Sequence, residues 1–416
     1  MIAAATAEDP DPPGRWPQLA IIAIGVLLAF APWFSASAVA PLLAAEWQTT
    51  RLDLPLLTVA VQLGFAAGAL ILAGTGAADV LPGRGLFALG AVVAAVGNLG
   101  FAVAADGPTV AIAWRFATGF GLAAVYPIAL KMLASWFRRS RGLAIGVVIG
   151  ALTVGSALPH LLRALGQSAG ANWHATVAAA SALAIGGGVL VAVAARPGPF
   201  EPTPSRFSVT VAGRAFREPS VRLANLGYLG HMWELYAMWT WLPLFIAASF
   251  AASGAADPGR ASLVSFAVVS AGGLGCVLAG ALADRLGRTT LTIAAMAGSG
   301  GSAIAMGALF GADPSIVTLV SLGWGLTVVA DSAQFSAAVS ELAPTGTAGS
   351  ALSLQLAAGF VLTTITIVGI GVLDPTDRET WRLAFWLLAL GPAVGIVAMW
   401  RLRERPEAAK MASGHR

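Results

Sequence analysis

Long apolar runs separated by short polar segments fill almost the whole 416-residue chain. A helix that crosses a membrane needs about 20 mostly apolar residues, and the sequence contains twelve such runs. The expected spans are residues 17–38, 55–77, 85–105, 108–131, 142–162, 173–195, 222–249, 261–283, 289–311, 314–338, 347–373 and 381–400. The pattern therefore predicts an all-α integral membrane protein with twelve transmembrane helices.

One connection is much longer than the others and lies near the middle of the chain. Residues 196–221 contain several prolines followed by a basic stretch, which indicates a linker whose second part lies along the membrane surface. It divides the spans into six and six. We expect a tail at 1–16, an N-terminal six-helix bundle at 17–195, the linker at 196–221, a C-terminal six-helix bundle at 222–402 and a tail at 403–416.

Composition supports a lipid-facing protein. The chain is 57% hydrophobic and only 11% charged, whereas a soluble domain carries roughly 25% charged residues. A soluble fold of this size would lack the charge to cover its surface. The first span is too long for a signal peptide and follows acidic rather than basic residues, so we expect it to be retained.

Basic residues gather in alternate loops. The set of loops that includes both termini holds about 18 Lys and Arg, against about 5 in the other set. Positive charge favours the cytoplasmic side, so both termini are predicted to be cytoplasmic, in a multi-pass protein of a bacterial inner (plasma) membrane. This distribution explains the net charge of +4 without a nucleic-acid partner.

A repeated loop motif follows the second span of each half. The C-terminal copy reads Gly280-x-x-x-Asp284-Arg285-x-Gly287-Arg288, and the N-terminal copy, around Asp79 and Arg84, is degenerate. Together with Arg115-Phe-Ala-Thr-Gly-Phe-Gly in span four, the motif resembles the major facilitator superfamily (MFS), and the resemblance covers the whole chain. It implies two bundles that rock against each other around a central solute site. The chain also looks like the bacterial nitrate/cyanate-type facilitators. That resemblance would imply paired substrate-binding arginines in spans two and eight, as in the nitrate carriers. Neither span contains an arginine here, which argues against nitrate itself.

The loop carboxylates have a physical role in this scheme. A helix N-terminus carries partial positive charge and unpaired N–H groups, and each loop lies near the start of a span of the other bundle. We expect a conformational latch formed by Asp79, Arg84, Gly280, Asp284, Arg285, Gly287 and Arg288. The alternative is that these are loop charges that only fix topology.

Small residues recur every fourth position in spans two, five, eight and eleven. Span two carries Ala60, Gly64 and Gly68, and span five carries Gly142, Gly146 and Gly150; span eight carries Ala267, Ala271, Gly275 and Ala279, and span eleven has Ala351 and Gly359. Such stripes let helices approach closely. We expect them at the interface between the bundles, with generic helix packing as the alternative.

Ionisable groups within a membrane are costly and indicate function. Arg115 lies within span four, and Tyr126, eleven residues further on, shares its face of a continuous helix. Arg115 is a candidate for binding an anionic solute, with a structural arginine bonded to helix carbonyls as the alternative. Trp33 follows Pro32 in span one and is a candidate cavity residue.

Span seven carries His231 and Glu234 on one helix face, among aromatic residues that include Trp239. Glu234 is the first candidate for proton coupling, since an apolar site disfavours the charged carboxylate and lets it load and release protons near neutral pH. His231 is a candidate for binding solute or sharing the proton. A His–Glu pair that only orders the helix is the alternative.

Span ten contains Asp331 on a polar stripe with Trp324 and Gln334. Asp331 is the second candidate for proton coupling, with pairing to a basic group as the alternative. The predicted solute-binding residues are thus Trp33, Arg115, Tyr126, His231, Trp239, Trp324 and Gln334, and the predicted proton carriers are Glu234 and Asp331.

These features favour a secondary active transporter that works by alternating access. His231-x-x-Glu234 is only half a metal site, and no His-Glu-x-x-His or cysteine cluster accompanies it, so an intramembrane enzyme is a remote alternative and no metal or cofactor is expected. Span five lacks a Gly-Pro pair typical of the superfamily's proton antiporters. We therefore expect proton-coupled uptake of a small polar or anionic solute by a monomer, with drug or metabolite efflux as the main alternative and uniport still open.

Overall fold

The computed structural model describes residues 12–138, 140–200 and 208–415, and its described elements are all helical. The N-terminal part contains α1 Arg15–Ala29, α2 Ser35–Trp47, α3 Asp53–Thr75, α4 Ala77–Val80, α5 Gly83–Ala104, α6 Pro108–Leu122, α7 Tyr126–Ala134, α8 Arg141–Ser168 and α9 Trp173–Ala194. The C-terminal part contains α10 Val209–Ala215, α11 Pro219–Ala252, α12 Pro258–Leu286, α13 Arg288–Ala308, α14 Pro314–Val328, α15 Ser332–Leu342, α16 Ala348–Leu373, α17 Arg378–Leu388, α18 Leu390–Arg403, and the 3₁₀ turns η1 Pro406–Lys410 and η2 Ala412–Gly414. The predicted fold class is confirmed.

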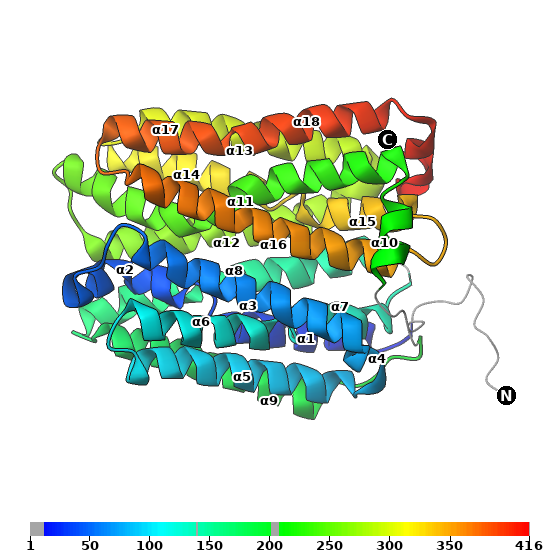
Figure 1. Cartoon of the computed structure of the whole chain (residues 1–416), viewed down its shortest axis with the longest axis horizontal. Coiled ribbons are helices and arrows are strands. Elements are labelled where there is room, and N and C mark those ends of the chain that lie inside the picture. Colours follow the sequence, from blue (N-terminus) through cyan, green and yellow to red (C-terminus); the bar gives the residue numbers. More distant parts are fainter. Residues whose placement is uncertain (1–11, 139, 201–207, 416) are drawn as a thin grey trace.

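Eleven helical segments among the described residues are long and apolar enough to cross a membrane. The remaining expected span, the first, consists of α1 and α2, which are separated by a break at residues 30–34. Figure 1 shows α1 to α9 in the lower half of the molecule and α11 to α18 in the upper half, with the short α10 at one end. Part of the expected linker, residues 201–207, lies outside the described residues.

Helix starts follow the local sequence. Pro108, Pro219, Pro258 and Pro314 each occupy the first turn of a helix, where the missing N–H costs nothing. Asp257 and Asp313 cap α12 and α14 through hydrogen bonds from the backbone N–H groups of the first turn. These caps fix the turns that precede α12 and α14, where the sequence predicted short connections between spans.

Four spans are interrupted near their middle. Span one breaks at 30–34, span four at 123–125, span ten at 329–331 and span twelve at 389. Pro32 accounts for the first break because it lacks an N–H. In the break of span ten, the carbonyl oxygen of Val329 accepts hydrogen bonds from the backbone N–H of Ser332 at 3.0 Å and from the Sγ of Cys276 on α12 at 3.4 Å. The breaks place backbone polar groups and non-helical turns in the centre of the molecule.

Two helix pairs join the bundles. In the first, α8 packs on α12 so closely that a Cβ on Gly146 would lie 2.8 Å from the carbonyl oxygen of Cys276, and one on Gly150 would lie 2.8 Å from that of Gly273. In the second, α3 packs on α16, where the buried Oε1 of Gln62 accepts a hydrogen bond from the Oγ1 of Thr363.

The small-residue stripes have divided roles. The span-five stripe lies between the bundles as expected. The prediction for span two was wrong: Gly64 and Gly68 pack against Phe116 and Phe120 of α6 in their own bundle. Gly275 of span eight likewise faces Leu326 of α14. Glycine also permits close packing within a bundle, so spacing alone does not identify the partner helix.

We predict that Gly150→Val destabilises the contact between the bundles, because its side chain meets the backbone of α12 rather than a side chain that can move. Overpacking of this kind costs about 1–3 kcal/mol. The matched control is Gly301→Val on α13, where an added Cβ has no heavy atom within 4 Å. Thermal unfolding in detergent should occur at a lower temperature for Gly150→Val than for the control, and equal unfolding temperatures would contradict the prediction.

Candidate functional site

A cavity of about 60 Å³ lies between the two bundles. The N-terminal bundle lines it through the break in span one, α3, α7 and α8. The C-terminal bundle lines it through α11, the break in span ten, α15 and α16. The lining residues are Phe30, Trp33, Phe65, Tyr126, Ile149, Leu152, Thr153, Tyr228, Met232, Leu235, Tyr236, Trp239, Val329, Ser332, Ser336, Leu356 and Phe360.

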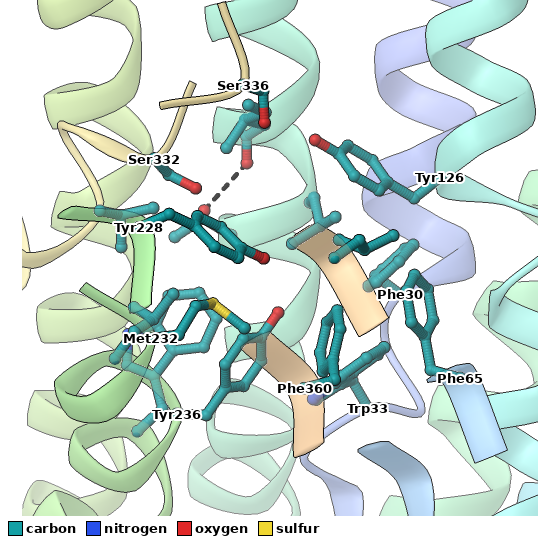
Figure 2. A pocket seen from close by; sticks show the side chains of 17 residues that line it. Phe30, Trp33, Phe65, Tyr126, Tyr228, Met232, Tyr236, Ser332, Ser336 and Phe360 are labelled. Atoms are coloured by element: carbon teal, nitrogen blue, oxygen red, sulfur yellow. Dashed lines mark hydrogen bonds between the residues drawn. The ribbon is translucent and has the colours of Figure 1, made fainter. Parts of the chain in front are cut away.

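The lining is aromatic and hydroxyl-rich, and its described residues include no charged side chain. The chain contains three tyrosines, and all of them line this cavity. Figure 2 shows Ser332, Ser336 and Tyr126 toward one end, and Trp33, Phe65 and Phe360 toward the other, with Tyr228 between them. The cavity therefore has a polar end and an aromatic end.

Several hydrogen-bonding groups in the lining have no partner among the described residues. The indole nitrogens of Trp33 and Trp239 are buried without a hydrogen bond. A buried donor without a partner costs about 1–3 kcal/mol. These two N–H groups, together with the hydroxyls, can therefore bind acceptor oxygens on a solute.

Aromatic contacts cross between the bundles at the aromatic end of the cavity. The ring centroids of Trp33 and Tyr236 are 5.7 Å apart, and those of Phe65 and Phe360 are 4.7 Å apart. Beyond them, Phe34 lies edge-on to Trp239, with centroids 5.7 Å apart. These rings separate the central cavity from a second cavity.

The second cavity, of about 250 Å³, lies between α2 and α8 of one bundle and α11 and α12 of the other. His160, Arg163 and Gln167, on one face of α8, contribute its polar wall. It adjoins the first: Pro243 lines it one helical turn, roughly 6 Å, beyond Trp239 of the central cavity. We call this second cavity the outer vestibule, after the orientation predicted from the sequence. The contact between Phe34 and Trp239 lies between it and the central cavity.

Arg115 is fully buried and lies outside both cavities. Its guanidinium donates to the carbonyl oxygen of Pro32 at 2.9 Å, the Oγ of Ser35 at 2.9 Å and the Oδ1 of Asn98 at 2.7 Å, and it also donates to the carbonyl oxygen of Trp33. These acceptors include the carbonyls freed by the break in span one. Arg115 therefore has the bonding expected of a structural arginine, which was the alternative to a role in binding an anionic solute.

Arg115 and Tyr126 do not act from one helix face. Span four is interrupted at 123–125, and Tyr126 begins α7. The spacing argument required an unbroken helix, so the expectation of a shared face was wrong. Tyr126 lines the central cavity and Arg115 does not.

His231 pairs with span ten rather than with Glu234. Its Nδ1 lies 2.8 Å from the Oδ1 of Asp331, and both side chains are almost completely buried. Asp331 occupies the break in span ten, between the cavity residues Val329 and Ser332. A buried acid–base pair therefore adjoins the wall of the central cavity.

Glu234 accepts hydrogen bonds from the Nε1 of Trp324 at 2.7 Å and the Oγ of Ser299 at 2.9 Å. Neither Glu234 nor Trp324 lines the cavity. Since α11 presents Tyr228, Met232 and Tyr236 to the cavity, Glu234 points from the opposite face toward α13 and α14. It joins three helices of its own bundle.

Gln334 and Arg288 form a further polar network. The guanidinium of Arg288 donates to the Oε1 of Gln334 at 2.8 Å and to both carboxylate oxygens of Glu341, at 2.7 and 2.5 Å. All three residues belong to the C-terminal bundle.

The predicted latch residues are placed as follows. Gly287 has a φ of 86°, which favours glycine. Gly280 approaches Gly142 on α8, and Arg84 and Arg285 are exposed. The side chains of Asp79 and Asp284 lie outside the described part of the structure.

Of the predicted solute-binding residues, Trp33, Tyr126 and Trp239 line the central cavity, whereas Arg115, His231, Trp324 and Gln334 do not. Sequence reasoning missed Tyr228, Phe360, Ser332 and Ser336 as cavity residues. The available signal was the rarity of tyrosine: the chain contains three Tyr, against 18 Phe and 13 Trp.

Two membrane-spanning bundles around a shared central cavity are the plan of a secondary transporter. The family model described as Major Facilitator Superfamily matches residues 22–367, which is most of the chain. The chain belongs to the Major Facilitator Superfamily, as the loop motif suggested.

Known proteins agree with this membership. The chain is 29% identical over 182 residues to the MFS transporter asaE of Aspergillus flavus, a match that covers 42% of this chain and only 38% of that relative. The fold is similar to a partially occluded, inward-open structure of the xylose transporter XylE from E. coli, with TM-score 0.72, 15% identity and coverage of 93% of this chain and 97% of that one. It is also similar to a bacterial homologue of the human lysosomal transporter Spinster, with TM-score 0.71, 13% identity and coverage of 95% and 100%. At these identities the structures support the fold alone.

Proposed function

We propose that the protein is a proton-coupled transporter that binds an uncharged amphipathic solute in the central cavity. The observation that carries this proposal is the lining, which joins eight aromatic side chains with several hydroxyls and two unpartnered indole donors and, among its described residues, contains no charged group. A charged solute without a counter-charge would lose its hydration without compensation. An uncharged solute with a ring or apolar face and several acceptor oxygens fits both ends of the cavity.

This proposal narrows the class of solute expected from the sequence. An anionic solute was expected because Arg115 was assigned to its binding. The guanidinium is instead engaged by four acceptors around the break in span one. Among the described residues that line the cavity, no other cation takes its place.

The buried His231–Asp331 pair is the proposed proton site. Asp331 lies in the break of span ten, which lines the cavity. A change in the charge of the pair would therefore act both on the solute site and on the break in the helix. The titratable groups packed around it are Tyr228 and Glu234 on α11 and Cys276 on α12, while Arg288 is held one side chain further away by Gln334. Glu234 is proposed as a residue that positions α11 against α13 and α14.

Transport proceeds by rocking of the two bundles, with the linker and both termini on the cytoplasmic side. The basic loops support this orientation. A structure of a proton:xylose symporter shares the fold, which is compatible with symport. Uptake is proposed because the vestibule of about 250 Å³ opens on the outer side, beyond the aromatic contact.

Tyrosine hydroxyls should contribute directly to solute affinity. We expect Tyr126→Phe combined with Tyr228→Phe to raise the Kd of the transported solute about 5- to 100-fold, because two hydrogen bonds of about 0.5–1.5 kcal/mol each are lost without loss of volume. Solutes are first found by a screen of uncharged, anionic and cationic compounds against the protein in reconstituted vesicles. Isothermal titration then gives the Kd.

Two serines on α15 provide a matched pair of variants, one inside the cavity and one outside it. Ser336 lines the cavity, whereas Ser340, one turn further on, is exposed and lies outside it. Ser336→Ala should weaken binding and Ser340→Ala should not. Transport confined to anions, with unchanged affinity in the tyrosine variant, would overturn the proposed solute class.

A further inference from the structure

A hollow of about 580 Å³ lies outside the solute pathway, at the end of the molecule that carries α10. It is bounded by the start of α11 and the end of α18. Its lining residues, called here the basic hollow, are Pro219, Arg222, Leu223, Arg401, Glu404, Arg405 and Pro406. Three arginines and one glutamate give it a positive charge.

The arginines of the basic hollow are available to a ligand. Arg222 and Arg401 are exposed and have no ion-pair partner among the described residues. The glutamate is engaged elsewhere, because an oxygen of Glu404 accepts a hydrogen bond from the Nε1 of Trp400 at 2.9 Å. Arg405 lies 3.3 Å from Glu407, in a loose pair that leaves part of its guanidinium facing outward.

The hollow opens toward lipid. On α18, Leu390, Val394 and Val397 are exposed at helical spacing on the membrane-facing side, and Arg401 continues the same stripe one turn further. On α11, Leu226 is exposed one turn after Arg222. An apolar stripe on α18 and an exposed leucine on α11 thus both lie one turn from an arginine at the hollow.

Trp400 fixes the depth of the hollow in the membrane. Its indole is 57% exposed beside Arg401. Exposed tryptophans at helix ends gather at the membrane interface, at the level of the lipid headgroups. The arginines therefore lie where lipid phosphates lie, with apolar helix surface extending from them into the hydrocarbon.

We propose that the basic hollow binds an anionic phospholipid. Arg222 and Arg401 bind the phosphate oxygens through charge-assisted hydrogen bonds, Arg405 adds positive charge, and the acyl chains lie along Leu226 and Val397. Basic pockets between membrane helices are suited to anionic headgroups. This inference concerns a surface remote from the central cavity and holds whatever the solute or the coupling ion is.

The test uses the full-length protein in detergent, analysed by native mass spectrometry with added phosphatidylglycerol, cardiolipin or phosphatidylcholine. We expect the anionic lipids to be retained at least tenfold more tightly than phosphatidylcholine. The double variant Arg222→Gln/Arg401→Gln should lose this preference. The matched control, Arg260→Gln/Arg378→Gln, removes two exposed arginines at the opposite end of the molecule and should keep it.

Two further measurements test whether the bound phosphate belongs to a lipid and whether the double variant is folded. Glycerol phosphate, which lacks acyl chains, should compete poorly, and competition as strong as that of the lipid would overturn the lipid assignment. Circular dichroism and melting temperature of the double variant should equal those of the unchanged protein. Equal lipid retention by the double variant, or no preference for anionic lipids in the unchanged protein, would overturn the proposal.

Discussion

Asp331→Asn is expected to abolish accumulation of solute by a proton gradient while exchange of solute across the membrane continues. The substitution preserves volume and removes the charge that pairs with His231 at 2.8 Å. A membrane potential of 100 mV supplies about 2.3 kcal/mol per proton, which corresponds to roughly 50-fold accumulation at one proton per solute. In the variant this ratio should fall to about 1.

The measurement compares proton-driven uptake with counterflow in reconstituted vesicles. Counterflow requires only that the loaded transporter change its conformation, so it reports folding and solute binding together. Glu234→Gln is the matched control, since it also neutralises a buried carboxylate on the neighbouring helix. If Asp331→Asn accumulates solute normally and Glu234→Gln does not, Glu234 is the proton carrier and Asp331 has a structural role.

Arg115→Ala is expected to destabilise the N-terminal bundle by at least about 3 kcal/mol. The change leaves the carbonyl oxygen of Trp33 without its donor, and a buried polar group left unpaired costs about 1–3 kcal/mol. It also removes the charge-assisted hydrogen bonds to the carbonyl oxygen of Pro32 and the Oδ1 of Asn98, which keep Ser35 as a donor, and each such bond contributes about 1.5–3 kcal/mol. The variant should melt at a clearly lower temperature in detergent than the unchanged protein.

Arg163→Ala is the appropriate control for Arg115→Ala. Arg163 lines the outer vestibule and is only partly buried, so its loss should leave the melting temperature nearly unchanged. A direct solute role for Arg115 would give the opposite pattern. Arg115→Ala would then keep its melting temperature and lose binding.

The spans and the division into two bundles could be predicted because they depend on local hydrophobicity, which the membrane imposes on every segment separately. The break at Pro32 has a local cause, because proline lacks a backbone N–H. The break at Asp331 contains no proline, and Cys276 of α12, a distant helix in the sequence, adds a hydrogen bond to the carbonyl oxygen of Val329 there. A sequence pattern within span ten contains no such information.

Side-chain partners were the part that sequence could not supply. His231 and Glu234 share a helix face by spacing, yet each bonds to a different helix: His231 to Asp331, and Glu234 to Trp324 and Ser299. Spacing gives the direction of a side chain relative to its own helix axis, not the neighbour that it meets. Polar residues within the spans were correctly singled out, but which of them face the cavity depends on the packing of distant segments.

The backbone crossings of α8 and α12 have a mechanical consequence. Where Gly146 and Gly150 meet the opposite helix, mostly main chain is in contact, and the nearby side chains of Thr153 and Val154 lie against glycines of α12. This seam therefore offers a comparatively smooth pivot. In a rigid rotation about a pivot, atoms move in proportion to their lever arm. The seam between α3 and α16 has the longer lever arm, and its buried hydrogen bond between Gln62 and Thr363 must break before the bundles can turn far. In the proposed rocking motion, we therefore expect the pivot to set the direction of movement and the opposite seam to set the activation barrier and the turnover rate.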